Sequence, residues 1–201
     1  MDEIISVTSK RQYWDTLVFI NDYSTRDNIS YHLQYLEFCY VVNFYFTPSL
    51  TTGSLLRKTV IIEYVSIIET ILDSMIFELR VRDYPVGSFV GLHYLKKNTR
   101  FGELLEIARY YKILNEDILK KVEKIGEYRN RVHFKRVARN EKEWDYYTDY
   151  KLTETENIFE EFIEECRKRH RRLTSDVKVN DFIFPKNQAK GNRILTEAET
   201  A

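Results

Sequence analysis

The sequence predicts an all-α protein, a bundle of about four or five helices with a long central helix and an irregular C-terminal tail. Hydrophobic residues make up 43% and charged residues 31% of the 201 residues, as is typical of a globular protein. Six glycines and three prolines are few for this length, and scarce helix breakers favour helices over a turn-rich sheet. Several segments also repeat apolar residues at intervals of three and four, which is helical spacing.

The N-terminal part is expected to hold a short helix and a longer one. Residues 1–28 form a peripheral segment, with the short helix at 16–20. The longer helix covers residues 29–46, and Asp27 or Asn28 could cap it. Because this helix is rich in Tyr and Phe, a strand is an alternative for its last residues. Its aromatic residues could serve in core packing, in dimer packing or as stacking platforms.

The clearest helix is expected at residues 55–79, after a start signal at 52–54. Its broad apolar face favours a central position, touched on several sides. A loop follows, marked by the breakers Asp83, Pro85, Gly87 and Gly91. A short helix at 99–114 and a longer one at 115–134 are predicted next. The latter begins with Asn115, Glu116 and Asp117, residues that favour helix starts.

The remainder of the chain is expected to hold one more long helix. Residues 138–152 are interpreted as a loop, with a small hairpin as the alternative. The last helix covers 153–173, with acidic residues at its start and basic residues at its end. A single domain therefore spans 1–174, and 175–201 is an irregular or flexible tail that the apolar residues 182–184 could anchor.

Composition excludes several classes of protein. The 31 basic residues balance the 31 acidic ones over the whole chain. Between residues 120 and 139, however, there are eight basic residues and only two acidic ones. Such a patch attracts polyanions locally. Cys39 and Cys166 lack CxxC spacing, so neither a disulfide framework nor a zinc site is expected. No apolar run approaches the roughly 20 residues of a membrane span, and no signal peptide is recognisable. We expect a cytoplasmic protein without metal or cofactor.

One helix face carries an unusual residue. Ile118, Val122 and Ile125 step by four and three, and the same steps lead to Arg129, where another apolar residue would be expected. His133 lies about one turn further along nearly the same face. A guanidinium at a core-facing position costs free energy unless it is paired or reaches water or a ligand. The first alternative is that the apolar stripe has run past the end of the packed core. Arg129 then extends its charged end to water or pairs with an acid such as Glu69 or Asp73 on the central helix, and His133 is a helix-end histidine.

The second alternative comes from a resemblance. Arg129, Asn130 and His133, within the stretch GEYRNRVHF at 126–134, resemble the signature of the HEPN superfamily (higher eukaryotes and prokaryotes nucleotide-binding domain). The segments VSIIETIL at 65–72 and FGELLEIA at 101–108 also resemble the helices of this superfamily in their general residue pattern. The resemblance covers roughly residues 55–170 and implies a helical bundle. Three residues separate Arg129 from His133, fewer than is usual in the family.

The resemblance implies a metal-independent endoribonuclease, in a toxin–antitoxin or phage-defence context. Arg129, Asn130 and His133 would be catalytic and would line a cleft shared by two protomers of a homodimer. The RNA backbone would be held by Lys124, Arg131, Lys135 and Arg136. An antitoxin or regulatory protein is a further expected partner. The alternative, which the short Arg–His spacing favours, is a non-catalytic HEPN-like module that binds nucleic acid, nucleotide or a partner protein.

Overall fold

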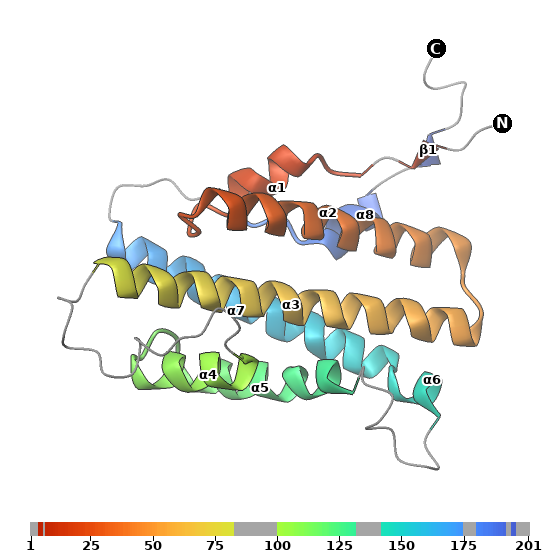
Figure 1. Cartoon of the computed structure of the whole chain (residues 1–201). Coiled ribbons are helices and arrows are strands. Elements are labelled where there is room, and N and C mark those ends of the chain that lie inside the picture. The colour runs from red at the N-terminus through yellow and green to blue at the C-terminus, as the bar shows by residue number, and fades with distance from the viewer. Residues whose placement is uncertain are drawn as a thin grey trace.

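Helices make up most of the computed structural model (Figure 1), which describes residues 4–5, 7–82, 100–131, 142–174, 180–191 and 194–195. The helices are α1 (Lys10–Thr16), α2 (Tyr23–Phe46), α3 (Leu50–Arg82), α4 (Phe101–Tyr110), α5 (Glu116–Asn130), α6 (Glu143–Tyr146), α7 (Asp149–Leu173) and α8 (Pro185–Gly191). The two-residue strands β1 (Ile4–Ile5) and β2 (Ile194–Leu195) pair antiparallel. The predicted all-α class is confirmed.

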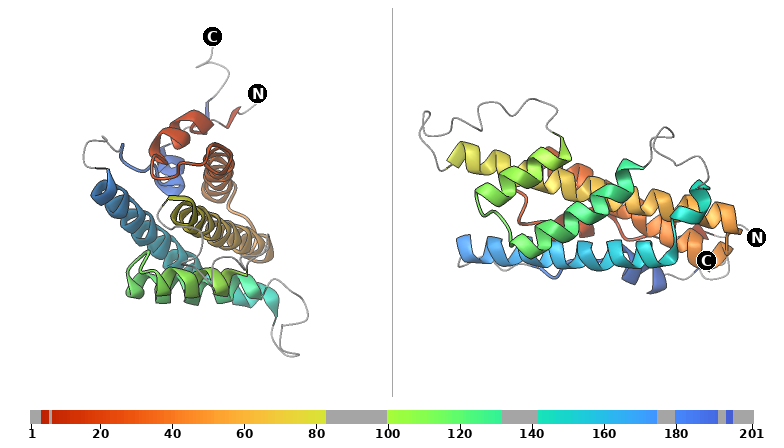
Figure 2. Two further views of the ribbon diagram at one scale, coloured as in Figure 1. Left: turned by 60° about the vertical axis from the view of Figure 1, so that its left-hand side comes forward. Right: turned by 90° about the horizontal axis from the view of Figure 1, so that it is seen from below.

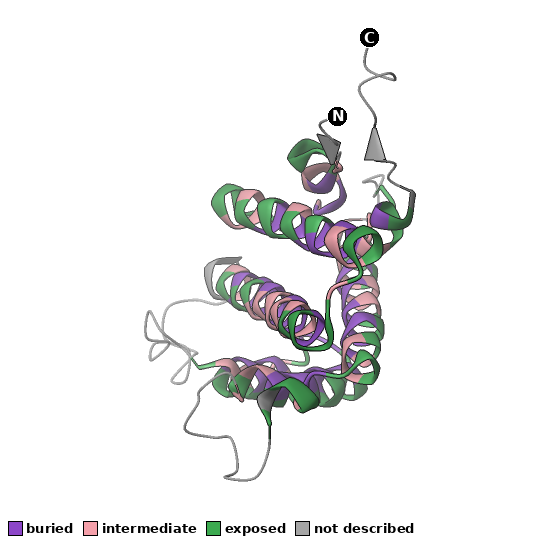
Figure 3. Ribbon diagram, turned by 90° about the vertical axis from the view of Figure 1, so that its right-hand side faces the viewer, coloured by how far each residue is buried: buried purple, intermediate pink, exposed green. Residues whose placement is uncertain are grey.

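Helix α3 is the central helix of the bundle, as predicted. It is 33 residues long and contacts α2, α4, α5, α6 and α7. Figure 2 shows α4 and α5 on one side of α3 and α7, with α1, α2 and α8 on the other side. The buried residues lie on the faces that the helices turn toward each other (Figure 3). Fully buried residues such as Ile68 and Ile71 each stabilise the fold by about 2 kcal/mol.

Helix α3 is longer than the predicted range 55–79. Its N-terminal turn continues into residues 50–54 because this turn has tertiary partners. Ser54 is buried, and its hydroxyl donates a hydrogen bond of 2.7 Å to the backbone carbonyl of Trp144. The expected loop containing Asp83 and its neighbouring breakers lies outside the described residues.

The prediction for the N-terminal segment is corrected in two respects. The short helix is α1 rather than residues 16–20, because Ser9 and Gln12 form a capping box that starts it earlier. Residues 17–20 form a turn after it. The segment is also less peripheral than expected, since Tyr13, Leu17 and Ile20 are buried in the core.

Helix α2 is continuous and starts earlier than predicted. Its cap is Asp22 rather than Asp27 or Asn28, and the Asp22 carboxylate accepts a hydrogen bond of 2.7 Å from the backbone N–H of Thr25. The helix runs to Phe46, so the strand alternative for its last residues is wrong.

The expected loop at 138–152 contains helical residues. Within it lie α6 and the first turn of α7. Helix α7 begins at Asp149, and Thr148 is its N-cap residue. Arg57 of α3 donates a hydrogen bond of 2.7 Å to the carbonyl of Tyr147 and so holds this segment against the bundle. Short elements of this kind depend on such tertiary contacts more than on their own propensity.

The tail is not irregular throughout, because it contains α8. Its anchor is as predicted: Phe182 is buried, and residues 183–184 pack against the core. Lys186 of α8 forms an ion pair with the buried Glu156 of α7, and Ala189 is fully buried. These contacts stabilise a seven-residue helix that would be marginal in isolation.

Candidate functional site

Helix α5 is positioned by its apolar face, which packs against α3, α4 and α7. Ile118, Val122 and Ile125 are buried on it, as the spacing predicts. Gly126 allows α4 to approach closely, because a Cβ atom at this position would lie only 2.5 Å from the ring of Phe101. The last turn of α5, with Arg129 and Asn130, is thereby held beside α3.

Arg129 forms an ion pair with α3. Its Nη1 atom lies 2.7 Å from Oε2 of Glu69, and the two side chains are 34% and 22% exposed. The alternative prediction that Arg129 pairs with Glu69 is therefore confirmed. A guanidinium carries five N–H donors in a planar fork, so one carboxylate contact through Nη1 leaves capacity for a second acceptor. Arg129 lies at the edge of the core with part of its side chain in solvent.

Of the other two predicted catalytic residues, only Asn130 lies among the described residues. Asn130 is the last residue of α5 and is exposed, and Arg131 follows as the C-cap residue. His133, Lys135 and Arg136 lie outside the described residues, and their roles stay predictions.

Lys124, the remaining predicted RNA-binding residue, contacts α7. Its ammonium forms an ion pair with Glu154, which also accepts a hydrogen bond from the hydroxyl of Tyr128. The bond to Glu154 raises the pKa of Lys124. Burial alone would raise the pKa of Glu154, but the hydrogen bonds from Lys124 and Tyr128 outweigh it, so this pKa lies below its ordinary value. Lys124 is thus already neutralised by a carboxylate.

Aromatic rings and cations gather where α5 ends and α6 and α7 begin. The guanidinium of Arg131 lies 4.2 Å from the ring centroid of Tyr146, and the ammonium of Lys151 lies 3.0 Å from the same centroid. Lys142 lies 5.6 Å from the ring centroid of Trp144. We call this group, together with the exposed Tyr150, the aromatic–cation cluster: Arg131, Lys142, Trp144, Tyr146, Tyr150 and Lys151.

Sequence reasoning identified only Arg131 of this cluster. The prediction does not include the others, because it places them in a loop at 138–152, and a loop does not predict which side chains meet. The available signal was the aromatic run WDYYTDY at 144–150, flanked by Lys142 and Lys151. Exposed aromatic rings beside cations form surfaces on which nucleic-acid bases can stack while phosphates are neutralised.

The N-terminal end of α5, unlike the end near Arg131, lies beside a groove lined mainly by acidic residues. A groove of about 400 Å³ lies between the start of α5 and α7, lined by Asn115, Asp117, Ile118, Lys121, Glu160, Glu161, Glu164, Glu165, Lys168 and Phe184. Its carboxylates outnumber its ammonium groups, so the groove repels phosphate. Any polyanion on this side of the molecule would therefore favour the Arg131 end of α5.

Among the residues that the structure describes, no group of three or more His, Cys, Asp or Glu side chains could hold a metal ion. None of the helices described has both the length and the apolar character to cross a bilayer. Comparisons with family models, with curated proteins and with solved structures found no match to this chain.

Proposed function

We propose that this chain is a HEPN-like endoribonuclease that acts without a metal ion, with Arg129, Asn130 and His133 at its site. The observation that supports the proposal best is the position of Arg129. It stands on the core-facing stripe of α5, is oriented by Glu69 at 2.7 Å and remains one-third exposed. The exposed Asn130 and the aromatic–cation cluster lie at the same end of α5.

The proposed chemistry uses the ribose 2′-OH as the nucleophile. A base removes its proton, the oxygen forms a new bond to the adjacent phosphorus, and the bond from phosphorus to the 5′-oxygen breaks as that oxygen takes up a proton. His133 suits the proton transfer, since an imidazole titrates near neutral pH. Arg129 suits the crowded phosphate, because its planar fork donates to two oxygens. Asn130 would orient the phosphate or His133.

Glu69 fits this proposal as a positioning residue. An ion pair through Nη1 restricts the rotamers of Arg129, which reduces the entropy lost when the fork binds a phosphate. The partners in the proposal are RNA, a second protomer whose motif faces the same cleft, and an antitoxin or regulatory protein in a defence context.

A second candidate function is RNA or nucleotide binding without catalysis. One observation favours it. Trp144 and Tyr150 of the aromatic–cation cluster are exposed, so they supply stacking surfaces whether or not a reaction follows.

The test is cleavage of a single-stranded RNA in the presence of a chelator. We expect the wild type to cut it, and Arg129→Ala and His133→Ala to lower the rate by about 100-fold or more. Arg11→Ala is the matched control, since Arg11 also pairs with a carboxylate, Asp15, but lies on α1.

Activity that survives both motif substitutions would refute the site. An inactive wild type that binds RNA, with weaker binding in Arg129→Ala, would support the second candidate.

A further inference from the structure

Helix α2 carries two apolar faces. One packs into the bundle through residues such as Leu33, Leu36 and Tyr40, which are buried. On the opposite side a second stripe steps by four, three, four and three residues along the helix. This outer stripe consists of Tyr31, Tyr35, Phe38, Val42 and Tyr45, with Phe46 beside its end.

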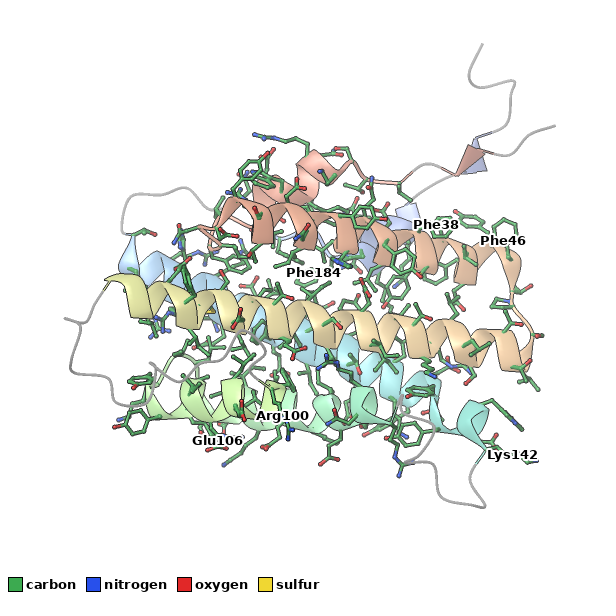
Figure 4. All side chains as sticks on the ribbon, viewed as in Figure 1. Phe38, Phe46, Arg100, Glu106, Lys142 and Phe184 are labelled. Atoms are coloured by element: carbon green, nitrogen blue, oxygen red, sulfur yellow. The ribbon has the colours of Figure 1, made fainter. Side chains whose placement is uncertain are left out.

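The outer stripe is open to solvent. The exposed fraction is 61% for Tyr31, 43% for Phe38 and 53% for Phe46, and 39% for both Tyr35 and Tyr45. Helices α1, α3 and α8 pack against the other sides of α2. Figure 4 shows Phe38 and Phe46 on the side of α2 that faces away from α3.

The outer stripe contains no charged side chain. Between residues 31 and 46 the acidic and basic residues are His32 and Glu37 alone. His32 forms a side-chain hydrogen bond with Glu63 of α3, and Glu37 is fully buried and accepts a hydrogen bond from Tyr13. A surface with aromatic residues and without charges has the composition of an interface core.

The area of the stripe approaches what a dimer needs. An aromatic side chain presents about 200 Å² when fully exposed, so the five exposed rings present about 450 Å² in one protomer. A standard interface buries about 800 Å² per partner. The aromatic rings therefore account for more than half of one side of such an interface, before the polar rim is included.

We infer that a second copy of this chain covers the outer stripe, with α2 packed against α2 across a two-fold axis. Alternating steps of three and four are the spacing of helix pairs that interlock knobs into holes. A two-fold interface places the same patch on both copies, and this patch carries no charge that would repel itself. A nucleic acid is a poor occupant, because the stripe offers no cation to its phosphates.

This surface is distinct from the proposed ribonuclease site. Helices α2 and α5 lie on opposite sides of α3 (Figure 1). Pairing through α2 would therefore not require the Arg129 ends to meet, and the inference does not depend on the proposed function.

The experiment is the molar mass of the full chain, measured by light scattering and by sedimentation equilibrium. Pairing through α2 alone gives a dimer, and a tetramer is expected if protomers also meet at the motif cleft of the proposed function. Phe38→Glu and Tyr35→Glu should each raise the dissociation constant by about 100-fold or more, because a charge at the centre of an apolar interface is costly. Tyr110→Glu is the matched control, an aromatic residue on α4 that is 78% exposed and should leave the dimer intact.

Circular dichroism of each variant verifies that the helices are retained. A monomeric wild type, or α2 variants that associate as strongly and to the same molar mass as the wild type, would overturn the inference. A mass that falls in Arg129→Ala but not in Phe38→Glu would do the same, because it would assign dimerisation to the motif cleft. RNA cleavage measured on the same variants tests the ribonuclease proposal separately.

Discussion

Arg129 occupies a helix position where the steps from Ile118, Val122 and Ile125 predict an apolar side chain. The structure gives the reason why a cation is tolerated there. The position lies at the edge of the core, and Glu69 of α3 supplies the opposite charge at 2.7 Å. Spacing alone identified the direction of the side chain and proposed Glu69 as one of two partners. It could not choose between them, since that choice depends on how far α5 slides along α3.

The contribution of the Arg129–Glu69 pair to protein stability can be measured separately from its contribution to the proposed site. Because both side chains are partly exposed, we expect a coupling energy of only about 0.5–1 kcal/mol in a double-mutant cycle of Arg129→Ala and Glu69→Gln. Urea unfolding measures it. If Arg129 contacts RNA phosphate, cleavage should fall about 10-fold further in Arg129→Ala than in Glu69→Gln, since Gln leaves the guanidinium in place. Equal losses in the two variants would indicate a purely structural pair.

Gly126 is constrained by its neighbour rather than by its backbone angles. A methyl group there would meet the ring of Phe101, so we expect Gly126→Ala to lower the free energy of unfolding by about 1–3 kcal/mol. Gly102→Ala is the control, because nothing lies within 4 Å of the added carbon. In α4 the same substitution should stabilise the protein by about 0.5–1 kcal/mol. If the denaturation midpoints of Gly126→Ala and Gly102→Ala shift in the same direction, the close approach of Phe101 to residue 126 does not determine the effect.

At the scale of the elements, α5 and α7 are joined by a polar contact as well as by packing. Glu154 of α7 accepts from both Lys124 and Tyr128 of α5, and together these bonds hold its pKa below the ordinary value of 4.5. A lowered pKa in the folded state contributes stability that is present above the unfolded value. That contribution is lost as the pH falls through the folded value.

Glu154→Gln should therefore lower the free energy of unfolding at neutral pH. It should also make the decline of stability between about pH 5 and pH 2 shallower than in the wild type. Chemical unfolding at a series of pH values measures both effects. Glu161→Gln, which removes a half-exposed carboxylate from the same helix, is the control. If the stability of Glu154→Gln falls as steeply at low pH as that of the wild type, Glu154 does not contribute to the acid sensitivity of the fold.

The elements also differ in how well their sequence predicts them. Helices α3, α5 and α7 repeat apolar residues at helical intervals, so their existence was predictable although their ends were not. Helices α6 and α8 are too short to show a period. They form because Ser54 and Arg57 hold the first segment and Glu156 pairs with Lys186 of the second.

At the scale of the whole molecule, a net charge of zero conceals an uneven distribution. The glutamates of α7 line a groove at the start of α5, whereas cations and aromatic rings gather at its other end. The uncharged outer stripe lies on a different helix, α2. One small bundle thus presents three surfaces of different chemistry.

The sequence by itself determined the all-α class, the central helix and the unusual position of Arg129. These features follow from local periodicity, because one helix face must be apolar to be buried. Only the tertiary structure decided that Glu69 is the partner of Arg129, that Tyr146 meets Arg131 and Lys151, and that no described helix of the same protomer covers the second apolar face of α2. These outcomes depend on how separate helices are aligned, and the side-chain packing that sets this alignment brings together residues far apart in the chain.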